Sequence, residues 1–152
     1  MAAPERTEQD ITGLLNMAGH SLSNRLAVAL ADIGLTPREQ CVLVHALEEE
    51  RTQIQLAALA DLDKTTMVTT VDQLEKRGLA ERRPSATDRR ARIIAVTDKG
   101  RLAAEEGQRR VDQVHADALD ALAEHRSAFV EALAALAGAT KETGPVRRPR
   151  GR

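Results

Sequence analysis

The chain has 152 residues, of which 42% are hydrophobic, 30% are charged and 1% are aromatic, and its formal net charge is -1. This length argues against two independent cores, and the lone phenylalanine, Phe129, provides no stacking platform for single-stranded nucleic acid. The single cysteine, Cys41, excludes an intrachain disulfide and a cysteine-based zinc finger.

The N-terminal residues MAAPERTEQD contain no apolar segment of the kind that a secretory signal needs. No apolar run elsewhere approaches the length that spans a bilayer. We therefore expect no membrane association and a cytoplasmic location, which a single cysteine also favours.

The first predicted helix lies within residues 7–35. Thr7 is its expected N-cap, with Asp10 at the third position, and Gly34 ends it. Apolar residues recur at helical spacing between these limits, which predicts one face buried along its whole length. These residues are Ile11, Leu14, Leu15, Ala18, Leu22, Leu26, Ala29, Leu30 and Ile33.

A second helix is predicted to begin after Thr36. The residues Thr36, Pro37 and Glu39 match a capping box with proline at the first helical position. The helix continues to three acidic residues at 48–50. It therefore separates the first helix from the segment that follows.

Residues 53–60 predict a short third helix, with Ile54, Ala57 and Leu59 available to the core. Residues 61–63 form the turn that follows it.

Asp63 is the expected cap of a fourth helix, which Gly78 ends. Met67, Val71 and Leu74 share one face of that helix and should point inward, because they are spaced at i, i+4 and i+7. The other face is polar. Two helices joined by a three-residue turn are typical of a helix-turn-helix.

A hairpin is predicted next, with strands at residues 79–83 and 91–96 and a loop rich in turn formers at 84–88. Residues 76–101 contain nine Lys or Arg against three acids, a local charge of +6 in a chain whose net charge is -1. A basic hairpin after a helix-turn-helix is a wing, and its field favours double-stranded DNA as a partner.

Helix is predicted again from Thr97-Asp98 to about residue 123, followed by a last helix that carries Phe129, Leu133 and Leu136. Residues 141–152 have proline, glycine and arginine but no apolar face, so we expect a disordered basic tail. Its arginines could add nonspecific DNA affinity or have no function. They are Arg147, Arg148, Arg150 and Arg152.

The order of these elements resembles that of the MarR (multiple antibiotic resistance regulator) family of bacterial transcription factors. The resemblance covers about residues 7–137. Its most specific segments are LEKRGL at 74–79, DRRAR at 88–92 and VTDKG at 96–100. It implies a mainly α fold with a small β-hairpin wing, in which a winged helix-turn-helix joins a helical dimerisation layer.

By this resemblance, residues 1–140 form one unit. The winged helix-turn-helix occupies 36–100, and the helices within 7–35 and 101–137 pair with those of a second copy to form a homodimer. The sequence agrees, because the apolar stripes of the flanking helices are too long for one small winged domain to cover.

The fourth helix is expected to enter the major groove and the wing to reach the minor groove. In the wing, the family pattern implies that Asp88 orients Arg90 into the minor groove and that Arg89 and Arg92 reach phosphates. Val68 and Thr69 are the nearest candidates for base contact, at positions where the family commonly has threonine and then arginine. The remaining expected contacts are Lys64, Thr65, Thr66, Gln73 and Arg77.

Family members commonly lose DNA affinity when a small, often aromatic or anionic, molecule binds between the dimerisation layer and the winged domain. This implies an effector crevice lined by the first and second helices and the helix after the wing. His20, Arg25 and His45 are its candidate polar residues. We expect no cofactor.

The remaining histidines and the cysteine allow two readings each. A zinc site that uses His45 and His115 is one alternative, and ordinary surface or interface histidines are the other. Cys41 fits structural burial better than redox sensing, because no cation near it in the sequence would lower its pKa.

We therefore expect a dimeric, ligand-responsive DNA-binding regulator, usually a repressor in this family, on a pseudo-palindromic operator. No phosphate loop, nucleophile elbow or HExxH motif indicates an enzyme. One alternative is a MarR-like helical interaction or small-molecule-binding protein without specific operator binding. Another is a nonspecific chromatin-like binder.

Overall fold

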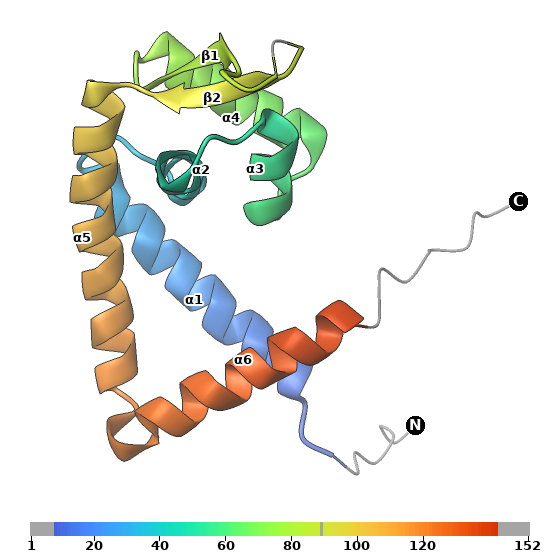
Figure 1. The fold of residues 1–152 in the computed structure, drawn as a ribbon. Coiled ribbons are helices and arrows are strands. Elements are labelled where there is room, and N and C mark those ends of the chain that lie inside the picture. The colour runs from blue at the N-terminus through green and yellow to red at the C-terminus, as the bar shows by residue number, and fades with distance from the viewer. Residues whose placement is uncertain (1–7, 89, 143–152) are drawn as a thin grey trace, which may run out of the picture. The chain divides into compact units, whose positions relative to one another are not determined.

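The computed structural model describes residues 8–88 and 90–142, with side chains to residue 138. The described part is mainly helical with a single antiparallel hairpin, as predicted (Figure 1). In chain order the elements are α1 (Ile11–Ala31), α2 (Pro37–Glu48), α3 (Gln53–Leu59), α4 (Lys64–Lys76), β1 (Ala80–Pro84), β2 (Arg92–Val96), α5 (Asp98–Asp120), the 3-10 helix η1 (Ala123–His125) and α6 (Arg126–Glu142). None of these helices combines the length and the apolar character needed to cross a membrane.

The chain divides into two compact units, Met1–Val114 and His115–Arg152, and the boundary falls within α5. The first unit contains α1 to α4, the hairpin and most of α5. The second contains the end of α5, η1 and α6.

Side-chain caps determine where the helices of the winged domain, residues 36–100, begin. The Thr36 hydroxyl accepts from the Glu39 amide at 3.1 Å while Glu39 accepts from the Thr36 amide at 2.9 Å, which confirms the predicted capping box. Thr52 and Gln55 form a second box at α3, which was not predicted. Asp63 caps α4, as predicted, by accepting from the Thr66 amide at 2.9 Å.

Leu56, Met67, Val71 and Leu74 are fully buried in one core that also contains Val42, Leu43 and Ile94. The prediction for α4 is therefore confirmed. For α3 the prediction is wrong for Ile54, which is 81% exposed, and for Leu59, which is 49% exposed, whereas Ala57 packs against the core as predicted. A helix of seven residues turns only one position, Leu56, fully into the core.

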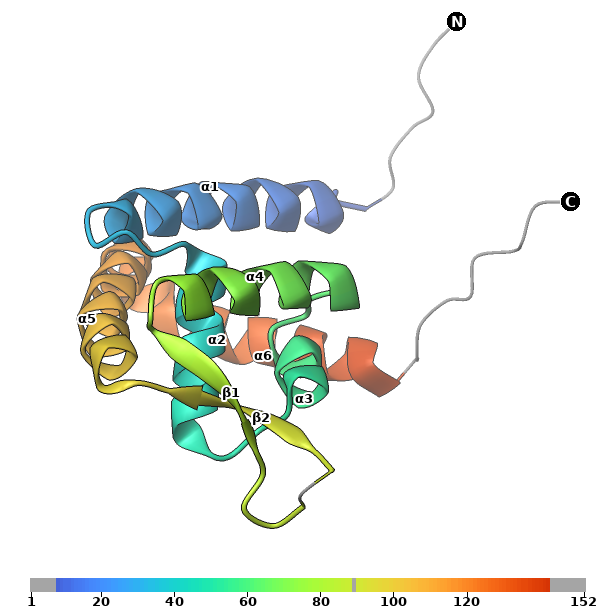
Figure 2. The same ribbon diagram turned by 90° about the horizontal axis from the view of Figure 1, so that it is seen from above.

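A turn at Gly78 leads from α4 into the wing. Gly78 has φ of +68°, a left-handed conformation that costs glycine little, and it ends the α4 region as predicted. The backbone then enters β1, which pairs antiparallel with β2 from Ala80 opposite Val96 to Pro84 opposite Arg92. Figure 2 shows that the tip of this hairpin extends beyond α3.

The start of the first helix differs from the prediction. α1 begins at Ile11 with Asp10 as its cap, since the Asp10 carboxylate accepts from the Gly13 amide at 2.9 Å. Thr7, the predicted cap, lies outside the described residues.

The predicted burial of α1 along one whole face is wrong for a single chain. Leu30 is its one buried residue, while Ile11 and Leu14, which belong to the predicted face, are 56% and 59% exposed. The winged domain covers only the C-terminal end of this helix.

In the second unit, α6 continues to Glu142, so its last two residues, 141 and 142, belong to a helix and not to a disordered tail. The predicted tail from residue 143 onward lies outside the described residues. Phe129, Leu133 and Leu136 are each about 40% exposed.

Candidate nucleic-acid interface

One face of α4 is buried and the opposite face is open. Lys64, Thr65, Thr69 and Gln73 are exposed, whereas Met67 on the other side is fully buried. Thr66 and Val68 are half-buried between these faces. The N-terminal half of α4 therefore presents the polar and methyl groups that the sequence analysis selected for DNA contact.

Hydrogen bonds within α4 already use several of its hydroxyl protons. The Thr66 hydroxyl donates to Asp63 at 2.6 Å, and the Thr69 hydroxyl donates to the Thr65 carbonyl at 3.1 Å. The bond from the Thr66 hydroxyl is the main cause that lowers the pKa of Asp63 below its ordinary value. Thr66 thus acts as part of the cap, and Thr69 keeps its methyl group and an acceptor oxygen for a partner.

The loop of the hairpin is held by polar side chains that the sequence analysis missed. Ser85 is buried, and its hydroxyl accepts from the amides of Thr87 and Asp88, each at 3.2 Å. Glu50 accepts from the Ala86 amide at 3.1 Å. A serine at the first position of a turn is the signal that could have indicated this loop structure.

Asp88 accepts from the Arg90 backbone amide at 2.9 Å. It therefore orients Arg90 through the main chain. Arg90 and Arg92 are exposed, and neither has an ion pair within the described part of the chain. Arg89, the third predicted contact here, lies outside the described residues.

Several other basic residues of the segment 76–101 are paired with carboxylates. Arg77 binds Glu39 at 3.0 Å and also donates to the Gly34 carbonyl, so its guanidinium joins the end of α4 to the start of α2. Arg82 binds Asp72 and Glu75, and Arg83 binds Glu81. The local charge of +6 is therefore not all available to a ligand.

A cavity of about 250 Å³ lies between α1, α2 and α5 in the first unit. His45 is part of its wall. His20 and Arg25 are not part of its wall; both are exposed, and His20 lies 3.1 Å from Asn24 on its own helix. The residues that line the cavity are Leu26, Leu30, Pro37, Gln40, Cys41, Val44, His45, Gln108 and Val111.

Polar groups on this wall are few. Gln40 is buried and donates to the Ala104 carbonyl at 2.9 Å, while its Oε1 has no hydrogen-bond partner within the described structure. His45 Nδ1 lies 3.2 Å from Glu48, which also pairs with Arg51. Burial, and then the charge of Glu48, raise the pKa of the Cys41 thiol, which does not favour a reactive thiolate.

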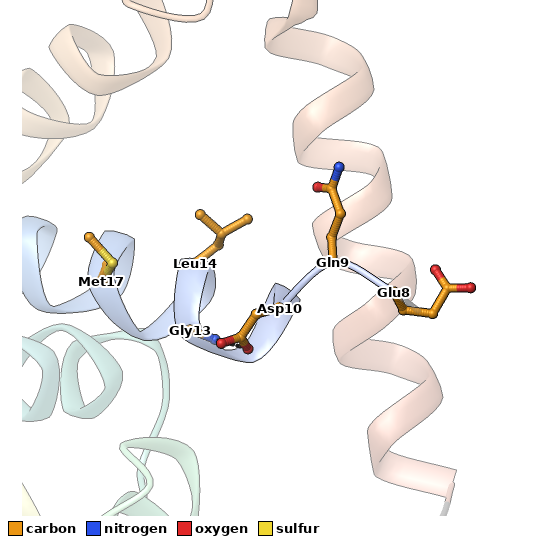
Figure 3. Close-up of a pocket in the computed structure, with 6 residues that line it drawn as sticks. All are labelled: Glu8, Gln9, Asp10, Gly13, Leu14 and Met17. Atoms are coloured by element: carbon orange, nitrogen blue, oxygen red, sulfur yellow. Dashed lines mark hydrogen bonds between the residues drawn. The ribbon is translucent and has the colours of Figure 1, made fainter. Parts of the chain in front are cut away.

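Other hollows occur in the described part of the chain. One, of about 410 Å³, lies at the start of α1 and is lined by Glu8, Gln9, Asp10, Gly13, Leu14 and Met17 (Figure 3), of which Leu14 and Met17 are exposed apolar residues. Another, of about 290 Å³, lies between α3 and α4 beside Lys64. Among the described residues, no group of three or more His, Cys, Asp or Glu is arranged to hold a metal ion, so the structure gives no support to the zinc alternative.

Comparison with known proteins supports one family. Residues 33–91 match the MarR family. The structure of CouR from Rhodococcus jostii RHA1 bound to p-coumaroyl-CoA is similar with 31% identity and a TM-score of 0.72, over 86% of this chain and 96% of that one.

Two further structures are similar. The transcriptional repressor CouR bound to a 23-mer DNA duplex has 30% identity and a TM-score of 0.75, over 84% of this chain and 92% of that one. A MarR-family transcriptional regulator from Rhodococcus sp. RHA1 has 29% identity and a TM-score of 0.77, over 94% and 100%. The chain therefore belongs to the MarR family of transcriptional regulators.

Proposed function

We propose that this regulator binds a pseudo-palindromic operator as a homodimer, usually to repress, and releases it when a small molecule occupies the cavity between α1, α2 and α5. Since it acts on DNA, we place it in the bacterial cytoplasm. The observation that carries this proposal is the open polar face of α4 beside a hairpin whose Arg90 and Arg92 are exposed and form no ion pair with any described residue.

The DNA contacts divide by chemistry. Val68 and Thr69 can place methyl groups against a thymine methyl, and Lys64 and Thr65 at the helix start suit phosphates or base edges. Arg90 at the wing suits a narrow minor groove, where the potential is most negative. Arg92 suits a phosphate. Arg77 contributes through the α2–α4 joint instead, because Glu39 and Gly34 hold its guanidinium.

The exposed apolar residues of α1 and α6 support pairing with a second copy. Leu14 is 59% exposed and Phe129 is 41% exposed, and burial of such side chains is the main source of stable association. A two-fold axis between two α4 helices requires half-sites about one helical turn apart.

The cavity suits a small ring compound. An apolar cavity of roughly 150 Å³ can hold benzene, so about 250 Å³ leaves room for substituents. Its described wall contains neither lysine nor arginine, and His45 is the group that could face an anion. Such a ligand acts only through different affinities for the DNA-binding and released states, typically a coupling of about 1 to 3 kcal/mol.

A mobility-shift titration against duplexes from the protein's own upstream intergenic region tests this function. Specific retention at physiological salt supports it. Arg90→Ala should weaken binding by about 1 to 3 kcal/mol, whereas Arg83→Ala, which removes an arginine paired with Glu81, should have a smaller effect. Unchanged affinity for Arg90→Ala at fixed salt would contradict its assignment.

The alternative, a helical interaction or small-molecule-binding protein without operator recognition, predicts no retention even at low salt. A nonspecific binder predicts equal affinity for all duplexes and a steep dependence on salt.

A further inference from the structure

Arg82 on β1 joins three elements of the winged domain. Its Nη2 donates to Asp72 at 2.7 Å and its Nη1 donates to Glu75, both on α4. Its Nε donates to Gln53, the first residue of α3, at 3.2 Å. Its backbone amide donates to Glu75 at 2.7 Å. One residue therefore ties the first strand of the wing to both helices of the helix-turn-helix.

These bonds limit what Arg82 can do at a DNA surface. Each of its three guanidinium nitrogens already donates a hydrogen bond, and its charge faces two carboxylates. An arginine in this arrangement adds little net attraction for phosphates. Arg90, which is exposed and has no ion pair in the described structure, is the contrasting case.

We propose that Arg82 is a positioning residue for sequence-specific recognition: it sets the wing in relation to α4, so that both reach adjacent grooves together. This inference rests on the proposed function, in which α4 and the wing contact DNA. A residue of this kind contributes to the affinity for the preferred duplex, because α4 and the wing must both be correctly positioned there. It releases no counterions, so it adds nothing to the salt dependence.

The first test compares Arg82→Met with Arg90→Ala in the full-length protein. The probes are a duplex that the wild-type protein selects from a random-sequence pool and a scrambled duplex of equal composition. We expect Arg82→Met to weaken binding to the selected duplex about tenfold or more, leave the scrambled duplex within about twofold, and leave the salt slope unchanged. Arg90→Ala should lower the salt slope by about one. The affinity of Arg82→Lys for the selected duplex should lie between those of wild type and Arg82→Met, because a single ammonium group replaces a guanidinium that donates from three nitrogens.

The second test removes a carboxylate and keeps the arginine. Glu75→Gln makes the surface more positive. If Arg82 acted by its charge alone, this variant should therefore bind DNA more tightly. The positioning role predicts weaker binding to the selected duplex, because Glu75 accepts from both the guanidinium and the amide of Arg82. The double variant Arg82→Met/Glu75→Gln should bind about as weakly as Arg82→Met alone. The single variant Glu75→Gln, which keeps Arg82, leaves the inference testable even if Arg82→Met does not fold.

The outcomes separate this inference from the function on which it rests. Loss of affinity for both duplexes together with a slope lowered by one would make Arg82 a phosphate contact and overturn the inference alone. Tighter binding by Glu75→Gln would do the same. If the wild-type protein selects no duplex, the proposed function fails and this inference fails with it.

Discussion

The winged domain and the helices outside it differ in how completely one chain buries them. In residues 36–100 the large side chains of the core, among them Leu56 and Met67, are fully buried. In α1, Met17 and Val28 are each more than 70% exposed, and in α6 Phe129 is 41% exposed. One copy of the chain is thus enough to build the DNA-binding part. The outer helices keep apolar faces that a second copy would cover.

The largest expected effect is a loss of stability in the winged domain. A Cβ at Gly100, where α5 begins, would lie 1.9 Å from the Leu79 carbonyl oxygen, which is backbone and cannot rotate away. Gly100→Ala should therefore lower the free energy of unfolding by about 2 to 4 kcal/mol, measured by urea denaturation.

Gly19→Ala, on α1 outside the winged domain, is the matched control. Nothing lies within 4 Å of the added Cβ on α1, so we expect no loss and a gain of up to about 1 kcal/mol from helix propensity. Equal destabilisation by the two variants would contradict the distinction between the two regions.

The second prediction concerns the exposed faces. Leu14→Glu puts a charge on the apolar face of α1 and should weaken dimerisation about tenfold or more, because burying an unpaired charge at an interface is costly. Sedimentation velocity across a concentration series measures this. Leu59→Glu changes a leucine that is 49% exposed on α3 and should leave the dimer intact. An unaffected dimer in Leu14→Glu would remove α1 from the interface.

A smaller effect is expected where α5 packs on α2. A Cβ at Gly107 would lie 2.1 Å from Gln40 Oε1, but this is the end of a side chain that can move. Gly107→Ala should cost about 1 kcal/mol, because the bond from Gln40 to the Ala104 carbonyl is lost while alanine favours the helix. Combining it with Gln40→Ala should give less than the sum of the single effects in a double-mutant cycle of unfolding free energies.

The smallest expected effect is a dependence of stability on pH, caused by Asp63 at the start of α4. The pKa of Asp63 is lowered in the folded protein, first by the Thr66 hydroxyl and then by the Thr66 amide. Its contribution to stability is present above the unfolded pKa, near 3.8, and is lost as pH falls through the lower folded value. Urea midpoints from pH 5 to pH 2.5 should therefore fall less steeply for Asp63→Asn than for wild type. Identical slopes would contradict the role of this carboxylate.

Local signals determined most of the architecture. Capping residues at Thr36 and Asp63, the spacing of Met67, Val71 and Leu74, and the glycine at 78 were each sufficient to place an element, because each acts through neighbours within one or two helical turns. The resemblance carried by residues 74–100 led to the same family as the comparisons did.

Contacts between distant segments could not be derived from the sequence. Arginines at 77, 82 and 90 look alike in the chain, yet Glu39 engages the first, Asp72 and Glu75 engage the second, and the third is exposed. Nor could the sequence show that Leu56 is buried in the core while Ile54 is exposed. It also could not show that His45 lines the cavity while His20 does not. Residue type and spacing therefore determined the helices, the wing and the excess of charge, while the packing of elements far apart in the chain decided which charges are neutralised and which remain for DNA, since pairing depends on distances in space.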